Sequence, residues 1–402
     1  MTKTHKTRKM FNGILGLFLA VLLLTACGKK GQDEFEKGKA LYTAQDYKTA
    51  VTQFALAADK GHAEAQYMIG LCYAEGKGVG KSMEEAFKWY RKAAENGNSE
   101  AIRYLGVCYA NGEGVEENLE EAFKWYRKAA DHGDAEAMNY LGMCYFRGEG
   151  VKQDKEAAFK WYRKAADKGN IYSMYNLAIC YEHGFGIKKD QEESVKWYRK
   201  AAEGGHDDAM CYLAELYYNG EGVKRDNAEA VKWYRKAAEK GNIEAMFRLG
   251  KCYDGLFDKE TDKESFKWYR EAAYNGHVHA MYRLGVCYSL GSGVEEDKSE
   301  SFKWFRKAAE NGDADAMYHL ARWYSSGIYV KKDEFTAIQW LRKAADNGSS
   351  SAMYEFGVIC EKGYGAFADA DDDDAIIWYR KAADKGNKDA IRKLEELTKD
   401  QK

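Results

Sequence analysis

The nine cysteines are the residues of this sequence whose chemistry must be decided first. A thiol can form a disulfide, bind a metal ion or act as a nucleophile, depending on its spacing and surroundings. Six of them occupy equivalent places in a repeating pattern: Cys72, Cys108, Cys144, Cys180, Cys252 and Cys287. Other copies of the pattern carry Leu216, Trp323 and Ile359 there, so the position requires an apolar side chain. A disulfide needs Cα atoms within roughly 7 Å, whereas even adjacent helix axes lie ~8–10 Å apart. We therefore predict buried free thiols.

Three further patterns look like ligand sites but lack the spacing that such sites require. The loop Gly112-Glu-Gly114-Val115 has no third glycine, and a dinucleotide fingerprint also requires a preceding strand. The pair His277 and His279 lies at the start of a helix and is interpreted as a solvated turn, because no zinc-type helix motif accompanies it. The acidic run 369–374 lacks the glycine and the spaced ligands of a calcium loop, and it precedes a helix, whose dipole favours acidic residues there. We therefore predict no catalytic residue, no metal site and no cofactor.

A ten-residue segment, KWYRKAAENG at 88–97, returns along the chain and explains why the cysteines recur. Its tryptophan marks each copy: Trp89, Trp125, Trp161, Trp197, Trp233, Trp268, Trp304, Trp340 and Trp378. The interval is 36 residues, apart from one of 35 and one of 38. Between tryptophans, Ala101, Leu105 and Cys108 fall at i, i+4 and i+7, the spacing of one helix face. Each unit therefore contains two predicted helices. Because proline is absent, glycines such as Gly97 must end them.

Repeated helix pairs bury their apolar faces only against their neighbours, so the repeat predicts an all-α fold. We expect a right-handed α-solenoid of about ten stacked helix hairpins from about residue 34 to 387. The region 388–402 is expected to contain a capping helix, AIRKLEEL at 390–397, followed by a short tail. In this interpretation the Trp, the Tyr and the Ala-Ala pair of each copy are packing residues.

The combined pattern A-x-x-x-L-G-x-x-Y-x-x-G-x-G-V…A-x-x-W-Y-x-K-A-A-x-x-G resembles the Sel-one-like repeat (SLR) family, a relative of the tetratricopeptide repeat. The resemblance covers residues 63–387, and the hairpin expected at 34–62 looks more like a plain tetratricopeptide. The resemblance implies that the protein binds other proteins as a scaffold, and it leaves the partner undefined. One SLR branch, the cysteine-rich Helicobacter proteins, has two cysteines per repeat and is linked to penicillin binding. Each repeat here offers one, so the resemblance gives no support to that activity.

The N-terminus belongs to a different category from the repeats. A basic start is followed by a short apolar run and by Leu24-Thr25-Ala26-Cys27, which resembles a bacterial lipobox. We therefore expect a lipoprotein signal peptide at 1–26, acylation of Cys27 and a short tether at 27–33; a simple signal peptide or an uncleaved anchor is the alternative. In lipoprotein sorting an Asp after the cysteine retains the protein in the inner membrane. Gly28 stands there instead, which favours the outer membrane if the host is Gram-negative. We expect the protein on the periplasmic face rather than on the cell surface.

Charge excludes one class of partner and leaves one surface to interpret. The formal net charge is only −2, and export separates the protein from intracellular nucleic acid, so no nucleic-acid partner is expected. The helix that carries the tryptophan presents an arginine in every copy: Arg91, Arg127, Arg163, Arg199, Arg235, Arg270, Arg306, Arg342 and Arg380. An acidic residue such as Glu95 follows four positions after Arg91, which indicates a solvent face of i,i+4 charge pairs. A cationic ridge that binds an anionic partner is the alternative.

Binding is expected where the copies differ, and in tetratricopeptide-like solenoids the first helix of each pair lines the concave groove. One stripe of that helix gives the candidate partner-binding residues: Met68, Tyr104, Tyr140, Asn176, Tyr212, Arg248, Arg283, His319 and Glu355. A second row follows one or two turns further on: Glu75, Asn111, Arg147, His183 and Asn219. Aromatic and polar side chains together suit contact with a protein or peptide, or with an envelope glycan. Drift on an unused surface is the alternative. The neighbouring row is assigned to packing: Tyr67, Tyr175, Phe247, Tyr282, Tyr318 and Tyr354.

We therefore expect a protein–protein interaction scaffold without enzymatic activity, anchored at the bacterial cell envelope by acyl chains in the membrane. One alternative is a surface-exposed or secreted factor that binds a host protein. The other is an enzyme that acts on peptidoglycan or on a β-lactam. Such an enzyme requires a nucleophile with a base, or paired carboxylates in one cleft, and the sequence offers no unique cluster of that kind.

Overall fold

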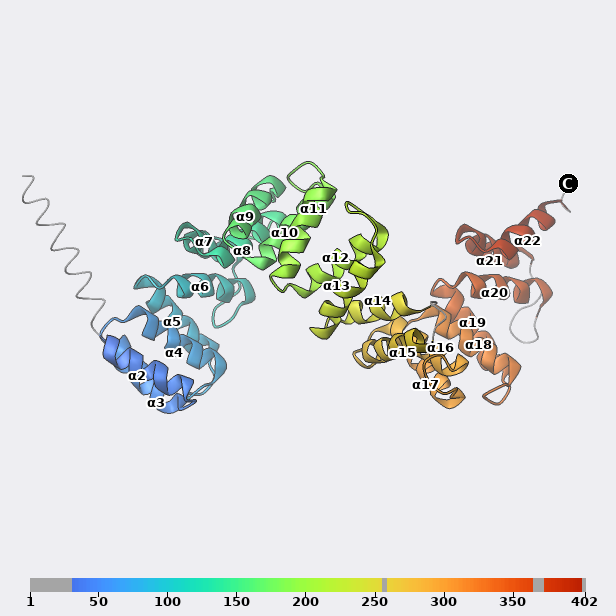
Figure 1. Ribbon diagram of the computed structural model, residues 1–402, viewed down its shortest axis with the longest axis horizontal. Helices are drawn as coiled ribbons and strands as arrows, with labels where there is room; N and C mark the ends of the chain where they lie inside the picture. Colours follow the sequence, from blue (N-terminus) through green and yellow to red (C-terminus); the bar gives the residue numbers. More distant parts are fainter. Residues whose placement is uncertain (1–30, 255–258, 364–371, 400–402) are drawn as a thin grey trace, which may run out of the picture. The chain divides into compact units, whose positions relative to one another are not determined.

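The computed structural model describes residues 31–254, 259–363 and 372–399 (Figure 1). Within these ranges it contains 21 helices, α2 to α22, and no strand, which confirms the predicted all-α fold. The predicted signal peptide and the lipidation residue Cys27 lie outside the described residues. So does the first half of the acidic run, whose remaining residues open α21 at Asp372.

The chain forms two compact units, Met1–His206 and Asp207–Lys402. The helices of the first are α2 (Gln32–Thr43), α3 (Tyr47–Ala58), α4 (Ala63–Glu75), α5 (Met83–Glu95), α6 (Ser99–Asn111), α7 (Leu119–Asp131), α8 (Ala135–Arg147), α9 (Lys155–Asp167), α10 (Ile171–His183) and α11 (Gln191–Glu203). Those of the second are α12 (Asp207–Asn219), α13 (Asn227–Glu239), α14 (Ile243–Tyr253), α15 (Lys259–Tyr274), α16 (Val278–Leu290), α17 (Lys298–Glu310), α18 (Ala314–Ser326), α19 (Glu334–Asp346), α20 (Ser350–Lys362), α21 (Asp372–Asp384) and α22 (Lys388–Lys399).

Consecutive helices pair into hairpins, from α2–α3 to α20–α21, and α22 packs against α21. We call the first helix of each hairpin helix A and the second helix B. Within each unit, helix B of one hairpin also packs against helix A of the next, so the hairpins stack (Figure 1). This stacking confirms the predicted solenoid and the terminal helix that follows its last hairpin.

Short polar residues and glycines set the ends of these helices, as the sequence predicts. The Asn98 side chain accepts a hydrogen bond from the Ala101 amide at 2.7 Å, which caps the start of α6. At the C-terminal ends of α5 and α6, Gly97 (φ 86°) and Gly112 (φ 69°) adopt the left-handed conformation that glycine tolerates best.

The second glycine of the Gly-x-Gly loop joins neighbouring hairpins. Gly114 has φ 73°, and a Cβ built on it would collide with the carbonyl of Met83, the first residue of helix B in the preceding hairpin. Gly150 lies against the carbonyl of Leu119 in the same way. The loop after each such helix A therefore rests backbone to backbone on the preceding helix B, and only glycine permits this approach.

In seven of the ten hairpins the core ring is the tyrosine of the Trp-Tyr pair. Tyr126 is 4% exposed, and its ring fills the space that the missing side chain of Gly106 leaves on helix A, with ring atoms 2.6 Å from an ideal Cβ there. The tryptophan is less central than the sequence indicated: Trp125 is only half-buried, with the ammonium of Lys128 4.9 Å from its ring. Tryptophans at the four equivalent positions from α11 to α17 are buried: Trp197, Trp233, Trp268 and Trp304.

The six recurrent cysteines are free thiols in the core, as predicted, although Cys252 is only half-buried. Burial raises the pKa of Cys108 and of Cys180 to about 12. Such thiols stay protonated and unreactive at neutral pH.

Candidate binding face

The predicted stripe lies at the sixth position of each helix A, where it covers the core ring of the preceding hairpin. The ring of Tyr104 lies 5.4 Å from that of Tyr90, and Tyr140 stacks on Tyr126 at 4.8 Å and 20°. Met68 packs in the same way beside the core cluster that contains Phe54. These residues are therefore half-buried, which corrects the expectation that the stripe lies outside the packing of the repeats.

The same arrangement holds in the second unit with other side chains. The guanidinium of Arg283 lies 5.6 Å from the Tyr269 ring and forms an ion pair with Asp254. His319 stacks on Phe305 at 5.0 Å and 9°, and its burial there lowers its pKa. The position therefore accepts any flat or extended side chain that can cover a ring.

Four members of the stripe depart from this pattern, and one of them is Glu355, whose carboxylate accepts a hydrogen bond from Tyr318 at 2.5 Å. Asn176 donates a hydrogen bond to Asn139 at 3.0 Å, and Arg248 forms an ion pair with Glu244 at 2.6 Å. Tyr212 is the most accessible member, at 44% exposed. The stripe therefore mixes packing with accessibility, and no single member is fully buried.

The neighbouring tyrosine row, at the fifth position of helix A, connects successive A helices. These contacts confirm that the row is rightly assigned to packing. The ring of Tyr67 lies 5.6 Å from Tyr104 of the next helix A, and the hydroxyl of Tyr318 donates to Glu355 at 2.5 Å. In α6 this position holds Arg103, which forms an ion pair with the N-cap carboxylate of Asp134 at 3.1 Å. The sequence interpretation missed this link, although a charged residue in a tyrosine row could have indicated it.

The second row, at the last position of helix A, is the accessible one. All five of its members in α4 to α12 are exposed: Glu75, Asn111, Arg147, His183 and Asn219. Their contacts are mostly local, such as Asn111 to Glu113 at 3.0 Å and Arg147 to Glu149 at 3.6 Å. The stripe and the second row together form what we call the helix-A face.

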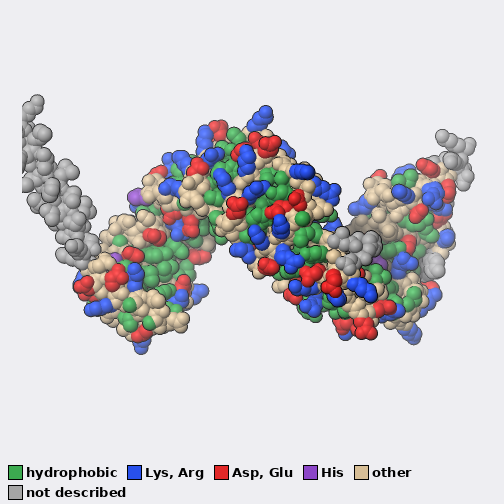
Figure 2. Space-filling model, viewed as in Figure 1, with side chains coloured by type: hydrophobic (Ala, Val, Ile, Leu, Met, Phe, Trp, Pro, Cys, Tyr) green, Lys and Arg blue, Asp and Glu red, His purple; other side chains and the backbone are tan. Residues whose placement is uncertain are grey.

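Most arginines of the described B helices form charge pairs, as predicted. Arg91 lies 3.2 Å from Glu95, and Arg306 lies 2.8 Å from Glu310. The lysine of the KWYRKAA motif is also paired in the same helices: Lys88 lies 2.6 Å from Glu85. Figure 2 shows Lys and Arg intermingled with Asp and Glu over the visible face of each unit. Such mixed charge is typical of a solvent face.

The two histidines at the start of α16 connect hairpins, which corrects their interpretation as a solvated turn. His277 caps α16 by accepting from the Ala280 amide at 3.1 Å, and its other ring nitrogen lies 3.1 Å from Glu244. This hydrogen bond lowers the pKa of Glu244 to about 2, with help from Arg248. His279 lies 2.7 Å from the N-cap carboxylate of Asp313 in the following hairpin.

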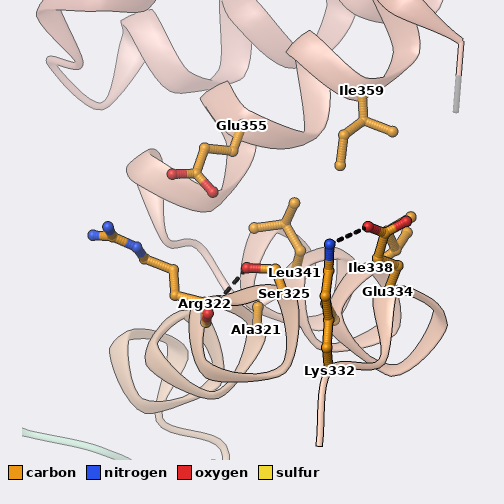
Figure 3. Close-up of a pocket in the computed structure, with 10 residues that line it drawn as sticks. Ala321, Arg322, Ser325, Lys332, Glu334, Ile338, Leu341, Glu355 and Ile359 are labelled. Carbon is orange, nitrogen blue, oxygen red and sulfur yellow. Dashed lines mark hydrogen bonds and ion pairs between the residues drawn. The ribbon is translucent and has the colours of Figure 1, made fainter. Parts of the chain in front are cut away.

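Two clefts open on the helix-A side at equivalent places in different hairpins. One, of about 370 Å³, lies between α6, α7 and α8; the other, of about 280 Å³, lies between α18, α19 and α20 (Figure 3). Their equivalent lining residues are Ala110 and Ser325, Glu117 and Lys332, Leu119 and Glu334, Tyr126 and Leu341, Tyr140 and Glu355, and Cys144 and Ile359. Each cleft thus involves the stripe, through Tyr140 in one and Glu355 in the other. A cleft between two successive A helices suits a side chain of a bound polypeptide.

Within the described part of the chain, every helix is too short or too polar to cross a membrane.

Comparison with known proteins agrees with this architecture. The Sel1 repeat model matches nine successive segments: 63–98, 99–134, 135–170, 171–206, 207–242, 243–277, 278–313, 314–349 and 350–387. The crystal structure of a protective antigen present in uropathogenic Escherichia coli strains, which displays an SLR fold, matches with a TM-score of 0.77 and 34% identity, over 94% of this chain and 82% of that one. A Sel1 repeat protein from Oxalobacter formigenes matches with a TM-score of 0.57 and 36% identity, over 60% of this chain and 99% of that one. No match was found among curated proteins. The nine matched segments and the stacked hairpins place the chain in the Sel1 repeat family.

Proposed function

We propose that this protein is a non-enzymatic scaffold that holds a partner polypeptide on its helix-A face while N-terminal acyl chains anchor it at the bacterial cell envelope. Proteins built from Sel1 repeats are protein–protein interaction scaffolds, which supports the class of function. The observation that carries the choice of face is the contrast between the two sides. The helix-B face repeats the same charge pairs, whereas the helix-A face varies between hairpins and contains both clefts.

The physical argument is that exposed charge pairs contribute little binding energy, since each is already solvated and paired. Half-buried aromatic residues such as Tyr104 and Tyr140, beside exposed polar ones such as Asn111, provide apolar area together with hydrogen-bonding groups. Interfaces take most of their energy from such aromatic and arginine side chains.

Site-specific photo-crosslinking in intact cells tests the proposed face. A photoreactive phenylalanine is introduced at exposed helix-A positions, Asn111 and Tyr212, and at exposed helix-B positions, Lys124 and Lys160, as matched controls. We expect a discrete protein adduct from the helix-A positions and none from the controls. Equal adducts from both faces, or adducts from the helix-B positions alone, would contradict the proposal. Adducts to glycan would show that the partner is a glycan and not a polypeptide.

The membrane anchor is a separate part of the proposal and rests on Leu24-Thr25-Ala26-Cys27. Acylation of Cys27 with two or three chains suffices for stable anchoring, because each buried methylene contributes about 0.8 kcal/mol. We expect Cys27→Ser to abolish labelling by a fatty-acid analogue and to release the protein from the membrane fraction or leave it uncleaved. A cleaved, unlabelled Cys27→Ser protein that stays in the membrane would refute the anchor.

A surface-exposed factor is the second candidate, and one comparison favours it. The structural relative with a TM-score of 0.77 is described as a protective antigen, a property expected of a protein that antibodies can reach. Protease treatment of intact cells distinguishes the two locations. We expect the periplasmic protein to survive treatment until the outer membrane is permeabilised; degradation in intact cells would establish surface exposure instead.

A further inference from the structure

The α18–α19 hairpin departs from the repeat at three places. Leu341 stands where other hairpins have the core aromatic ring, Trp323 where most have cysteine, and Tyr329 where most have the second loop glycine. Trp323 packs on Tyr329, with ring centroids 4.4 Å apart, and on Phe305 at 5.3 Å. These two large rings therefore fill the side toward α17, and neither lines the cleft.

The other hairpins show what normally occupies the position of Leu341. All nine carry an aromatic ring there: Phe54, Tyr90, Tyr126, Tyr162, Tyr198, Tyr234, Tyr269, Phe305 and Tyr379. The ring runs from helix B along a small residue of helix A, and in three hairpins its hydroxyl donates to a carboxylate one turn further on. Tyr269 donates to Asp254 at 3.1 Å. Tyr198 donates to Glu182 and Tyr379 to Glu361, both at 2.6 Å.

In the α18–α19 hairpin the path of that ring is open. The cleft of about 280 Å³ has Leu341 at the root of the missing ring and Ala321 along its side, and Ser325 takes the place that Glu182 has in α10. Figure 3 shows Glu355 and Ile359 pointing from α20 toward these residues from the opposite side. Glu355 has no ring to cover, because Leu341 stands at the ring position, and its carboxylate accepts a hydrogen bond from Tyr318 at 2.5 Å.

The charges around the cleft favour a neutral occupant. Lys332 and Glu334 form an ion pair at 2.8 Å on one side, and Arg322 and Glu355 lie on the other (Figure 3). Two cations and two carboxylates leave the rim balanced, so a carboxylate or a phosphate gains no net attraction. A neutral ring gains apolar contact with Leu341 and the neighbouring isoleucines, and a phenol hydroxyl also gains polar partners at the rim.

We propose that this cleft binds one aromatic side chain, tyrosine or phenylalanine, of a partner polypeptide, so that the partner supplies the ring that the α18–α19 hairpin lacks. The assignment rests on the proposed scaffold function and names the anchor that the helix-A face offers. A single aromatic side chain in a preformed cleft is the usual form of an interface hot spot. The cleft between α6 and α8 differs, because Tyr126 already occupies the ring position there.

The first test uses the full-length protein and a small probe, so it does not depend on the partner. N-acetyl-tyrosinamide binding is followed by ligand-observed NMR, with N-acetyl-leucinamide as the comparison ligand. We expect a Kd on the order of 1 mM for the tyrosine probe, as for a lone side-chain fragment, and binding at least tenfold weaker for the leucine probe. Equal binding of the two probes would overturn the assignment.

Leu341→Tyr fills the cleft with the ring of the other hairpins and should abolish binding of the tyrosine probe. The variant should fold, because Ala178 and Tyr198 already form the same alanine–tyrosine pair in the α10–α11 hairpin. The matched control is Leu290→Tyr, the same substitution at an exposed leucine in α16, which should bind the probe like the wild type. Undiminished probe binding by a folded Leu341→Tyr protein, with an unchanged melting temperature, would place the probe elsewhere and overturn the proposal.

The partner-level test separates this proposal from the scaffold proposal. If Leu341→Tyr reduces the photo-crosslinked adduct at Tyr212 at least tenfold, the cleft anchors the partner. If the adduct is unchanged, the anchor is refuted and the scaffold proposal stands; if no helix-A position yields an adduct, the scaffold proposal fails while the probe result stands on its own. Segment 364–371 contains Tyr364 and Phe367. Probe binding that appears only after both are replaced by serine would show that the chain fills its own cleft, and would also overturn the proposal.

Discussion

Two glycines with the same backbone conformation allow the contact between hairpins to be measured. Gly97 (φ 86°) and Gly114 (φ 73°) both lie in the left-handed region, so an alanine at either position is strained. They differ in surroundings. A Cβ on Gly97 meets nothing within 4 Å, whereas a Cβ on Gly114 would collide with the Met83 carbonyl of the preceding hairpin. Gly97→Ala and Gly114→Ala therefore form a matched pair.

The left-handed conformation costs an alanine roughly 1–2 kcal/mol, and this is the whole cost expected for Gly97→Ala. Gly114→Ala adds the cost of overpacking, typically ~1–3 kcal/mol, because the obstacle is backbone and cannot rotate away. We therefore expect Gly114→Ala to lower the free energy of unfolding by about 2–5 kcal/mol, and to exceed Gly97→Ala by about 1–3 kcal/mol. The difference between the variants measures the contact between hairpins.

Urea denaturation followed by circular dichroism gives the two free energies, and hydrogen exchange with mass spectrometry locates the loss. For Gly114→Ala, faster exchange should appear on both sides of the contact, in α5 and in α6. For Gly97→Ala it should stay at the turn between those helices. Equal costs for the two variants would refute the account of the Gly-x-Gly loop as a backbone contact between hairpins.

Three further outcomes are expected. Tyr126→Ala should cost roughly 3–5 kcal/mol by leaving a cavity, and Trp125→Ala only about 1–2 kcal/mol, since that ring is half-buried; the reverse order in urea denaturation would contradict our assignment of the core ring. Because hydrogen bonding lowers the pKa of Glu244 to about 2, its stabilising contribution should be complete above pH 4.5 and disappear as the pH falls toward 2. Urea titrations at several pH values should show that Glu244→Gln removes this part of the acid dependence; an unchanged pH profile would disprove the link. Cys108, whose pKa is raised to about 12 by burial, should be alkylated by iodoacetamide at pH 8 only after unfolding, and rapid native labelling would show that α6 is not packed as described.

The sequence predicts the fold well because each hairpin carries local sequence signals that determine its helices and their ends. The 36-residue interval, the helical spacing of Ala101, Leu105 and Cys108, and the capping glycines all depend on local structure, and the structure confirms them. The balance between tryptophan and tyrosine in the core was beyond sequence reasoning. The tryptophan recurs in all nine SLR copies and the tyrosine in seven, and only the packing of Gly106 against Tyr126 shows which ring is central.

The candidate binding residues show where sequence reasoning stops. Variation between copies points to the sixth position of helix A, but it does not reveal that Tyr140 covers Tyr126 and is therefore partly structural. The interpretation of His277 and His279 as a solvated turn was wrong for a similar reason. The partner of His279 is Asp313, 34 residues away in the next hairpin, and no local pattern indicates a contact at that range. The lipidation of Cys27 stays a prediction, as does the partner-binding role of the stripe.

The contact at the second loop glycine also bears on how such a chain can change its length over evolutionary time. A joint formed by Gly114 on Met83, and again by Gly150 on Leu119, needs nothing from the side chains of the particular pair of hairpins. If one 36-residue segment in this stretch were duplicated or deleted, the same backbone contact would form between the hairpins that become neighbours. The number of repeats can therefore change without compensating substitutions. The α18–α19 hairpin has lost that freedom. Its Tyr329 packs on Lys298 of α17, whose ammonium lies 4.8 Å from the ring. This contact is specific to the α16–α17 hairpin, so a duplication would have to include both hairpins to preserve it.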